Sequence, residues 1–111
     1  MRAATKITFF DEHGEKFFGE GPCLLLHAIE ETGSLRAASI SMGLAYTKAL
    51  RMIRHAEEAL GFSLTTRSVG GGSGGGSTLT PEGKEWLKKY ETYRNACIQA
   101  NSRLYMEIFS E

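Results

Sequence analysis

The sequence predicts a mainly α-helical fold with a small β component, and three observations carry this prediction. A short and a longer helical segment meet at a tight turn at Gly43. Two β-prone segments follow and flank a run of glycine and serine, GGGSGGGS. Apolar residues then recur at helical spacing over roughly the last 30 residues. Together these features indicate a helix-turn-helix, a β-hairpin wing and a long terminal helix.

Length and composition indicate one domain of ordinary size. The chain has 111 residues, of which 41% are apolar and 23% charged, as is typical of a soluble globular protein. We find no leader for export and no apolar run near the roughly 18 residues that span a bilayer, so we expect a cytoplasmic protein without membrane contact. For Cys23 and Cys97, buried thiols are favoured over a disulfide.

Charge is distributed unevenly along the chain. The net charge is zero, which counts mildly against nucleic-acid binding, because many DNA-binding domains are basic. Residues 1–33 carry three cations and six anions, a balance of −3, and residues 70–111 carry five of each. Residues 34–69 carry five cations and two anions, a balance of +3. Positive potential is therefore concentrated on the helix-turn-helix segment, where a phosphate backbone would need it.

The first element is expected to be a β-hairpin at about residues 5–18. Its β-prone runs, KITFF and EKFF, flank a DEHG turn in which Gly14 can adopt a positive φ. Its aromatic residues are Phe9, Phe10, Phe17 and Phe18. They exceed what an isolated hairpin could bury, so we expect them to dock on the helical core or on a partner subunit. A scaffold helix at about 21–32, with Pro22 in its first turn and Gly33 as its stop, comes next.

The predicted helix-turn-helix occupies about residues 34–60. Its first helix starts at Ser34, whose hydroxyl can cap the first turn. Its second helix has an apolar stripe spaced four, three and four residues apart, formed by Ala49, Ile53, Ala56 and Leu60. Cations fall on the other faces of this second helix, so an exposed basic face is expected.

The glycine run lies within a predicted wing at about residues 63–80 and allows three interpretations. It has the composition of an artificial flexible linker. A phosphate-cradling nucleotide loop is disfavoured, because no Gly-Lys-Ser/Thr follows. The third interpretation is the tip of a β-hairpin wing, whose bare backbone can approach DNA phosphates closely. Its position between two strand-like segments, directly after a helix-turn-helix, favours the wing.

A long helix is predicted for about residues 81–110. Thr80 is its cap and Pro81 lies in its first turn. A helix of this length would extend ~45 Å, more than so small a domain can cover. Its apolar positions approach a heptad seam, so we expect its distal half to pack against a second copy of the chain. The predicted dimer interface consists of Tyr93, Cys97, Ala100, Leu104 and Ile108.

A set of these residues resembles a known family. They are Ser34-Leu35, Ala37-Ala38, Met42, Ala49, Ile53, Glu57, Leu60-Gly61, Leu64, Arg67, Thr78-Leu79-Thr80-Pro81 and Gly83. The segment, roughly residues 21 to 90, resembles the DNA-binding domain of LysR-type regulators. The glycine-rich wing and the stretch from Gly33 to Tyr46 are more similar still to the molybdate-responsive ModE regulators. The resemblance implies a dimeric bacterial or archaeal transcription regulator with a winged helix domain.

Three departures from the family pattern concern individual contacts and domain content. Thr65 stands where a hydrophobic residue is common, and Ala45 stands where a serine near DNA is common. The chain also stops at Glu111, after the predicted dimerisation helix, whereas such regulators carry C-terminal effector or oxyanion-binding domains. We therefore expect a stand-alone DNA-binding member or a fragment, and this chain supports no site for molybdate or another oxyanion.

The expected DNA-binding mode places the second helix of the motif in the major groove, its N-terminal residues leading. The predicted recognition residues are Tyr46, Thr47, Lys48 and Arg51. The predicted phosphate and wing contacts are Ser34, Arg36, Arg54, Arg67, Gly72, Ser73 and Gly74.

The sequence therefore predicts a single winged helix-turn-helix domain over residues 1–111. We expect a homodimeric, sequence-specific regulator that binds double-stranded DNA without an effector domain of its own. The alternative is a winged helix used as a protein-interaction module or adaptor, which the neutral net charge favours. The histidines, His13, His27 and His55, are scattered along the chain. We expect no catalytic arrangement, no cofactor and no metal site.

Overall fold

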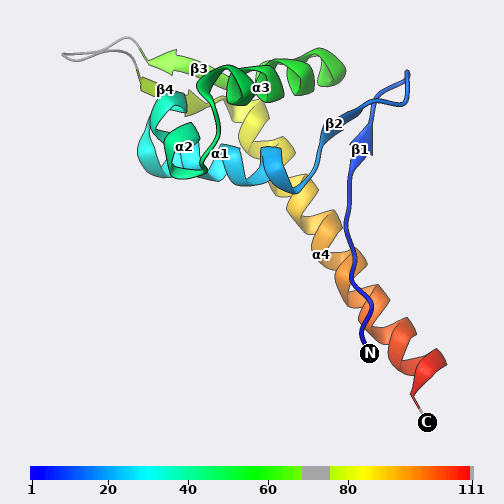
Figure 1. Cartoon of the computed structure of the whole chain (residues 1–111). Coiled ribbons are helices and arrows are strands. Elements are labelled where there is room, and N and C mark those ends of the chain that lie inside the picture. The colour runs from blue at the N-terminus through cyan, green and yellow to red at the C-terminus, as the bar shows by residue number, and fades with distance from the viewer. Residues whose placement is uncertain (69–75, 111) are drawn as a thin grey trace.

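The computed structural model describes residues 1–68 and 76–110. Two short β-hairpins and four helices build the fold (Figure 1). The elements are β1 (Phe9–Phe10), β2 (Lys16–Phe18), α1 (Glu20–Thr32), α2 (Leu35–Ser41), α3 (Tyr46–Leu60), β3 (Thr65–Ser68), β4 (Gly76–Leu79) and α4 (Pro81–Phe109). The predicted fold class, a mainly α winged helix-turn-helix with an N-terminal hairpin and a long last helix, is confirmed.

The helices α1, α2 and α3 form a body with the antiparallel β3–β4 pair beside it, and α4 runs out of that body (Figure 1). The molecule is accordingly elongated, 62 × 29 × 25 Å. Its core lies where the first half of α4 meets the helical body. The largest fully buried side chains are Tyr90, Phe18, Leu25, Leu26, Ile29, Leu64, Cys23 and Ser39. The distal half of α4 lies beyond this core.

Capping residues set the ends of the helices, as the sequence indicates. The Ser34 hydroxyl accepts a hydrogen bond from Ala37 N at 2.9 Å, and Thr80 Oγ1 accepts one from Gly83 N at 2.8 Å. In the turn between α2 and α3, Gly43 has a φ of +67°. Only glycine adopts this left-handed conformation without steric cost, so the angle between the two helices depends on it.

The first hairpin docks on α4 through its aromatic side chains. The Phe18 ring lies 5.4 Å from Trp86 and 4.9 Å from Tyr90, and the Phe9 ring lies 5.3 Å from Trp86, centroid to centroid. These are edge-to-face distances at which aromatic rings attract one another. Phe10 alone of the predicted aromatic set is largely exposed, at 55%. Docking on the helical core is therefore the outcome for this hairpin.

The N-terminal segment follows α4 instead of extending the first hairpin (Figure 1). Tyr90 Oη donates to the carbonyl of Ile7 at 2.9 Å, and Tyr105 Oη donates to the carbonyl of Met1 at 2.9 Å. The hydrogen bond from Tyr90 thus holds the Ile7 carbonyl against α4. The β-prone run that begins at Lys6 therefore forms a strand only at Phe9–Phe10, shorter than predicted.

Glu57 joins α3 to the base of the wing. Its Oε2 accepts a hydrogen bond from Leu64 N at 2.8 Å, and Leu64 is fully buried. Glu57→Ala leaves that buried N–H unpaired, so we expect the free energy of unfolding to fall by about 1–3 kcal/mol. The matched control is Glu58→Ala, an exposed neighbour that should change it by less than about 0.5 kcal/mol. Urea denaturation measures both, and equal losses would show that Glu57 has no capping role.

Candidate nucleic-acid interface

Helix α3 has one buried and one exposed face. Three residues of its predicted apolar stripe, Ala49, Ile53 and Ala56, are buried, and Leu60 is partly buried. Thr47, Arg51 and Arg54 are exposed and recur every three or four residues, so they share the opposite face. Helix α3 therefore presents a polar, cationic surface along its first two and a half turns.

A groove lies between α2, the start of α3 and the wing strands. Ser77 N in β4 donates to the carbonyl of Gly33 at 2.7 Å, which holds the wing beside the start of α2. The groove has a volume of about 700 Å³. It is lined by Gly33, Ser34, Leu35, Arg36, Tyr46, Leu50, Arg54, Thr65, Arg67, Gly76 and Ser77. It thus brings together five residues that the sequence singled out from separate elements: Ser34, Arg36, Tyr46, Arg54 and Arg67.

Tyr46 and Arg36 form one wall of this groove as a stacked pair. The Arg36 guanidinium carbon lies 4.9 Å from the centroid of the Tyr46 ring, within cation–π range. Tyr46 is half-buried, whereas Arg36 is exposed. The ring therefore orients the guanidinium, whose N–H groups remain available to an oxyanion.

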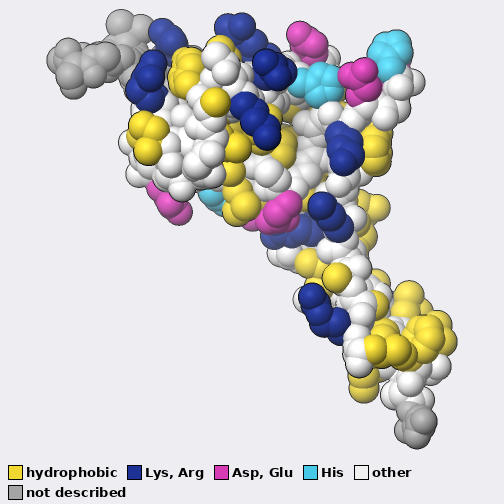
Figure 2. Space-filling view, viewed as in Figure 1, with side chains coloured by type: hydrophobic (Ala, Val, Ile, Leu, Met, Phe, Trp, Pro, Cys, Tyr) yellow, Lys and Arg dark blue, Asp and Glu magenta, His cyan; other side chains and the backbone are white. Residues whose placement is uncertain are grey.

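The electrostatics of this surface are one-sided. Figure 2 shows Lys and Arg side chains gathered over α2, α3 and the wing strands. Within residues 1–68 and 76–110, no carboxylate forms an ion pair with Arg36, Arg51, Arg54 or Arg67. Glu58 lines the hollow beside Arg51 and Arg54, so the positive surface consists of the groove and the first two and a half turns of α3.

The remaining predicted DNA contacts have different positions. Lys48 is exposed but lies at the margin of the α3 face, on the side away from the groove. Ser34 is half-buried and its oxygen already caps α2, so its hydroxyl hydrogen is what remains for a phosphate. The wing-tip residues Gly72, Ser73 and Gly74 lie outside the described residues.

Leu50 is a groove residue that was not predicted from the sequence. It is half-buried and lines both the groove and the adjoining hollow beside Arg51 and Arg54. The available signal was its position, because Leu50 is an apolar residue outside the buried stripe of α3. An apolar side chain between cations suits contact with a thymine methyl group.

The tip of the first hairpin approaches the far end of α3. His55 Nε2 lies 3.9 Å from Asp11 Oδ2 and 4.0 Å from Glu15 Oε2. The backbone N–H of Glu15 donates to Asp11 Oδ1 at 2.9 Å and, with a smaller contribution from His13 N–H, holds the pKa of Asp11 below its ordinary value. This cluster is acidic, so the cationic surface of α3 ends here.

The predicted dimer seam on α4 is partly exposed to solvent. Tyr93 is 54% exposed, Leu104 48% and Ile108 68%, and Figure 2 shows apolar side chains gathered near the end of this helix. Cys97 and Ala100 are half-buried within the single chain. The N-terminal segment lies along one edge of this seam through its hydrogen bonds to α4. That segment was not anticipated from the sequence.

Comparisons with known proteins agree with this geometry. Residues 24–84 match the family described as bacterial regulatory helix-turn-helix protein, lysR family. The chain is also similar to the molybdenum-pterin-binding protein MopB of Rhodobacter capsulatus, with 38% identity over 66 residues. That match covers 60% of this chain and 24% of MopB, so the chain corresponds to about a quarter of its relative. Among the described helices, none is both long and apolar enough to cross a membrane. The match from α1 to the first turn of α4 covers the whole helix-turn-helix and wing, and the chain belongs to the LysR-type family of bacterial regulatory helix-turn-helix proteins.

Proposed function

We propose that this chain binds double-stranded DNA in a sequence-specific manner as a homodimer and so regulates transcription in the manner of ModE-type regulators. The observation that carries the proposal is the continuous cationic surface of α3 and the groove, with its stacked Arg36 and Tyr46. The likeness to MopB supports the ModE-type assignment.

In the proposed complex, α3 enters the major groove with its N-terminal turns leading. Thr47 and Arg51 then face base edges, and Arg51 is the side chain suited to bidentate pairing with a guanine. Arg36, Arg54 and Arg67 lie around the groove and bind phosphates, which sets the register without reading sequence. Lys48, at the margin of the face, contributes through the phosphate backbone, as do the wing-tip residues.

The proposed homodimer rests on the exposed apolar residues of the distal half of α4. Leu104 and Ile108 project beyond the domain body, where no described residue of the same chain buries them. Two copies paired along this seam would present two recognition helices to a pseudo-palindromic site.

The test of this function is an unbiased selection of bound duplexes, followed by affinity measurements at several salt concentrations. Affinity should fall steeply with salt, because arginines that neutralise DNA phosphates release the counterions condensed on the DNA. Arg51→Ala should weaken binding to the selected duplex by about 10- to 100-fold and relax its base preference at one position.

The matched control is Lys88→Ala, which removes an exposed cation from α4, outside the groove. This variant should keep the base preference and nearly all of the affinity. If the chain shows no salt-dependent affinity for any duplex at low ionic strength, the alternative of a protein-interaction module replaces this proposal.

A further inference from the structure

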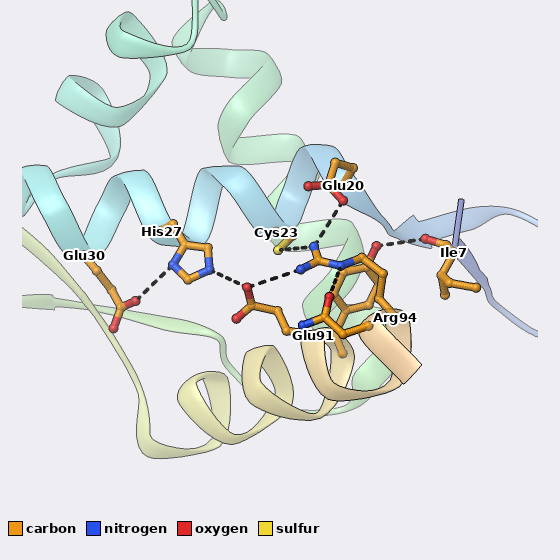
Figure 3. Close-up of polar contacts among 9 residues, drawn as sticks. Ile7, Glu20, Cys23, His27, Glu30, Glu91 and Arg94 are labelled. Atoms are coloured by element: carbon orange, nitrogen blue, oxygen red, sulfur yellow. Dashed lines mark hydrogen bonds and ion pairs between the residues drawn. The ribbon is translucent and has the colours of Figure 1, made fainter. Parts of the chain in front are cut away.

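A cluster of polar side chains lies where α1 meets α4, on a different side of the domain from the DNA groove. Cys23 and His27 are four residues apart on α1, so they lie on one face of that helix, and Glu91 reaches them from α4 (Figure 3). The Cys23 sulfur, a His27 ring nitrogen and a Glu91 carboxylate oxygen all lie within 4.8 Å of one another.

The three groups differ in their access to solvent. Cys23 is 1% exposed, whereas the side chains of His27 and Glu91 are 41% and 31% exposed. His27 Nε2 lies 3.0 Å from Glu91 Oε2. Both residues border a hollow of about 330 Å³ that opens to solvent beside α4. The cluster is therefore anchored on a buried sulfur and accessible from one side.

We propose that Cys23, His27 and Glu91 bind a Zn²⁺ ion, with water as the fourth ligand. Thiolate, imidazole and carboxylate are the three ligand types that Zn²⁺ takes from proteins. With bonds of about 2.0–2.3 Å, ligand atoms around a tetrahedral ion are roughly 3.3–3.8 Å apart. The donors therefore need to move by only about an ångström, which side-chain rotation supplies.

Arg94 is the group that weighs against a cation here. Its Nη1 lies 3.8 Å from Cys23 Sγ, and its Nη2 lies 3.7 Å from Glu91 Oε2. The same Nη1 pairs with Glu20 Oε2 at 3.2 Å, so the guanidinium is neutralised from outside the donor set. Zn²⁺ with one thiolate and one carboxylate is neutral as well. Arg94 can then donate a hydrogen bond to the metal-bound sulfur.

Among the other neighbours of the site, Glu30 suits the ion, whereas Lys84 and Lys88 line the same hollow as cations. Glu30 Oε1 lies 3.7 Å from His27 Nδ1, the ring nitrogen that remains when Nε2 binds the metal. A rotation of the Glu30 side chain that brings this carboxylate within hydrogen-bond distance of Nδ1 would orient the ligating histidine and raise its basicity. On binding, the Cys23 thiol loses its proton to solvent and Zn²⁺ replaces the contact between His27 and Glu91. The ion would then tie α1 to α4 at the point where α4 leaves the domain body.

The experiment is a titration of the purified, reduced, metal-free full chain with Zn²⁺, and with Co²⁺ as a spectroscopic substitute. We expect one ion per chain, a near-ultraviolet thiolate-to-cobalt charge-transfer band and a higher Tm with Zn²⁺. Cys23→Ser should remove the charge-transfer band. His27→Gln changes a half-exposed side chain and should weaken Zn²⁺ binding by about 100-fold while the chain stays folded.

Two variants serve as matched controls. Cys97→Ser removes the other free thiol, and His55→Gln removes the histidine of a second possible donor set, Asp11, Glu15 and His55. Both should bind Zn²⁺ as the parent does. The proposal is overturned if no stoichiometric ion binds, if the charge-transfer band depends on Cys97, or if His55→Gln loses the ion and His27→Gln keeps it.

Discussion

Replacing Gly83 with alanine is expected to destabilise this domain strongly, because the added methyl group has less room there than at any other glycine within residues 1–68 and 76–110. Gly83 is buried in the first turn of α4, against the residue that precedes the wing. An alanine Cβ at this position would lie 2.2 Å from the carbonyl oxygen of Leu64 and 3.0 Å from its carbonyl carbon. That oxygen already accepts a hydrogen bond from Thr80 N at 3.0 Å, so it cannot move away without breaking this bond. We expect a loss of about 3 kcal/mol or more.

Lys84→Ala is the matched control for this prediction. It introduces alanine one position later in α4, where the side chain is exposed and alanine is a good helix former. Chemical denaturation should therefore give Lys84→Ala nearly the parent's midpoint and Gly83→Ala a much lower one. Similar midpoints for the two variants would mean that α4 can shift away from Leu64 without cost.

Local signals explain why so much of the fold could be predicted from the sequence. The ends of α2 and α4 depend on Ser34 and Thr80, each of which bonds to a backbone N–H three residues later. The turn at Gly43 depends on one residue's backbone freedom. Such features involve only neighbours along the chain, so a short window of sequence contains everything that determines them.

Long-range contacts explain what could not be predicted. The path of the first residues depends on Tyr90 and Tyr105, which lie 83 and 104 positions from the carbonyls they bind. Nothing in the local pattern of KITFF distinguishes a strand that pairs from one whose carbonyls bond to a helix. Similarly, the family motif includes Gly83, but only the structure shows the Leu64 carbonyl that requires it.

The candidate sites show the same difference between local signals and long-range contacts. Arg36 and Tyr46 were selected separately from two helices, and their stacking became visible only in three dimensions. The four-residue spacing of Cys23 and His27 is a local signal for a metal site, although none was predicted. Glu91, 64 residues after His27, could not have been added from spacing alone.

If the proposed dimer forms through α4, the double variant Leu104→Lys/Ile108→Lys is expected to be a monomer. These side chains are 48% and 68% exposed in one chain, so charges there are solvated in the monomer and buried without partners in the dimer. Loss of the second recognition helix should weaken binding to a duplex with two half-sites by about 100-fold or more. Sedimentation velocity and duplex binding measure the two effects.

The double variant Gln99→Lys/Ser102→Lys separates dimer loss from a change in charge. It adds two lysines to the same stretch of α4, on exposed positions away from the seam. Added cations strengthen non-specific attraction to DNA, so this control should bind at least as well as the parent. The Leu104 and Ile108 variant should lose affinity for the duplex with two half-sites despite the same added charge. On a duplex with a single half-site, its affinity should equal that of the control. If it remains dimeric, α4 is not the interface, and the exposed apolar residues at its end need another partner.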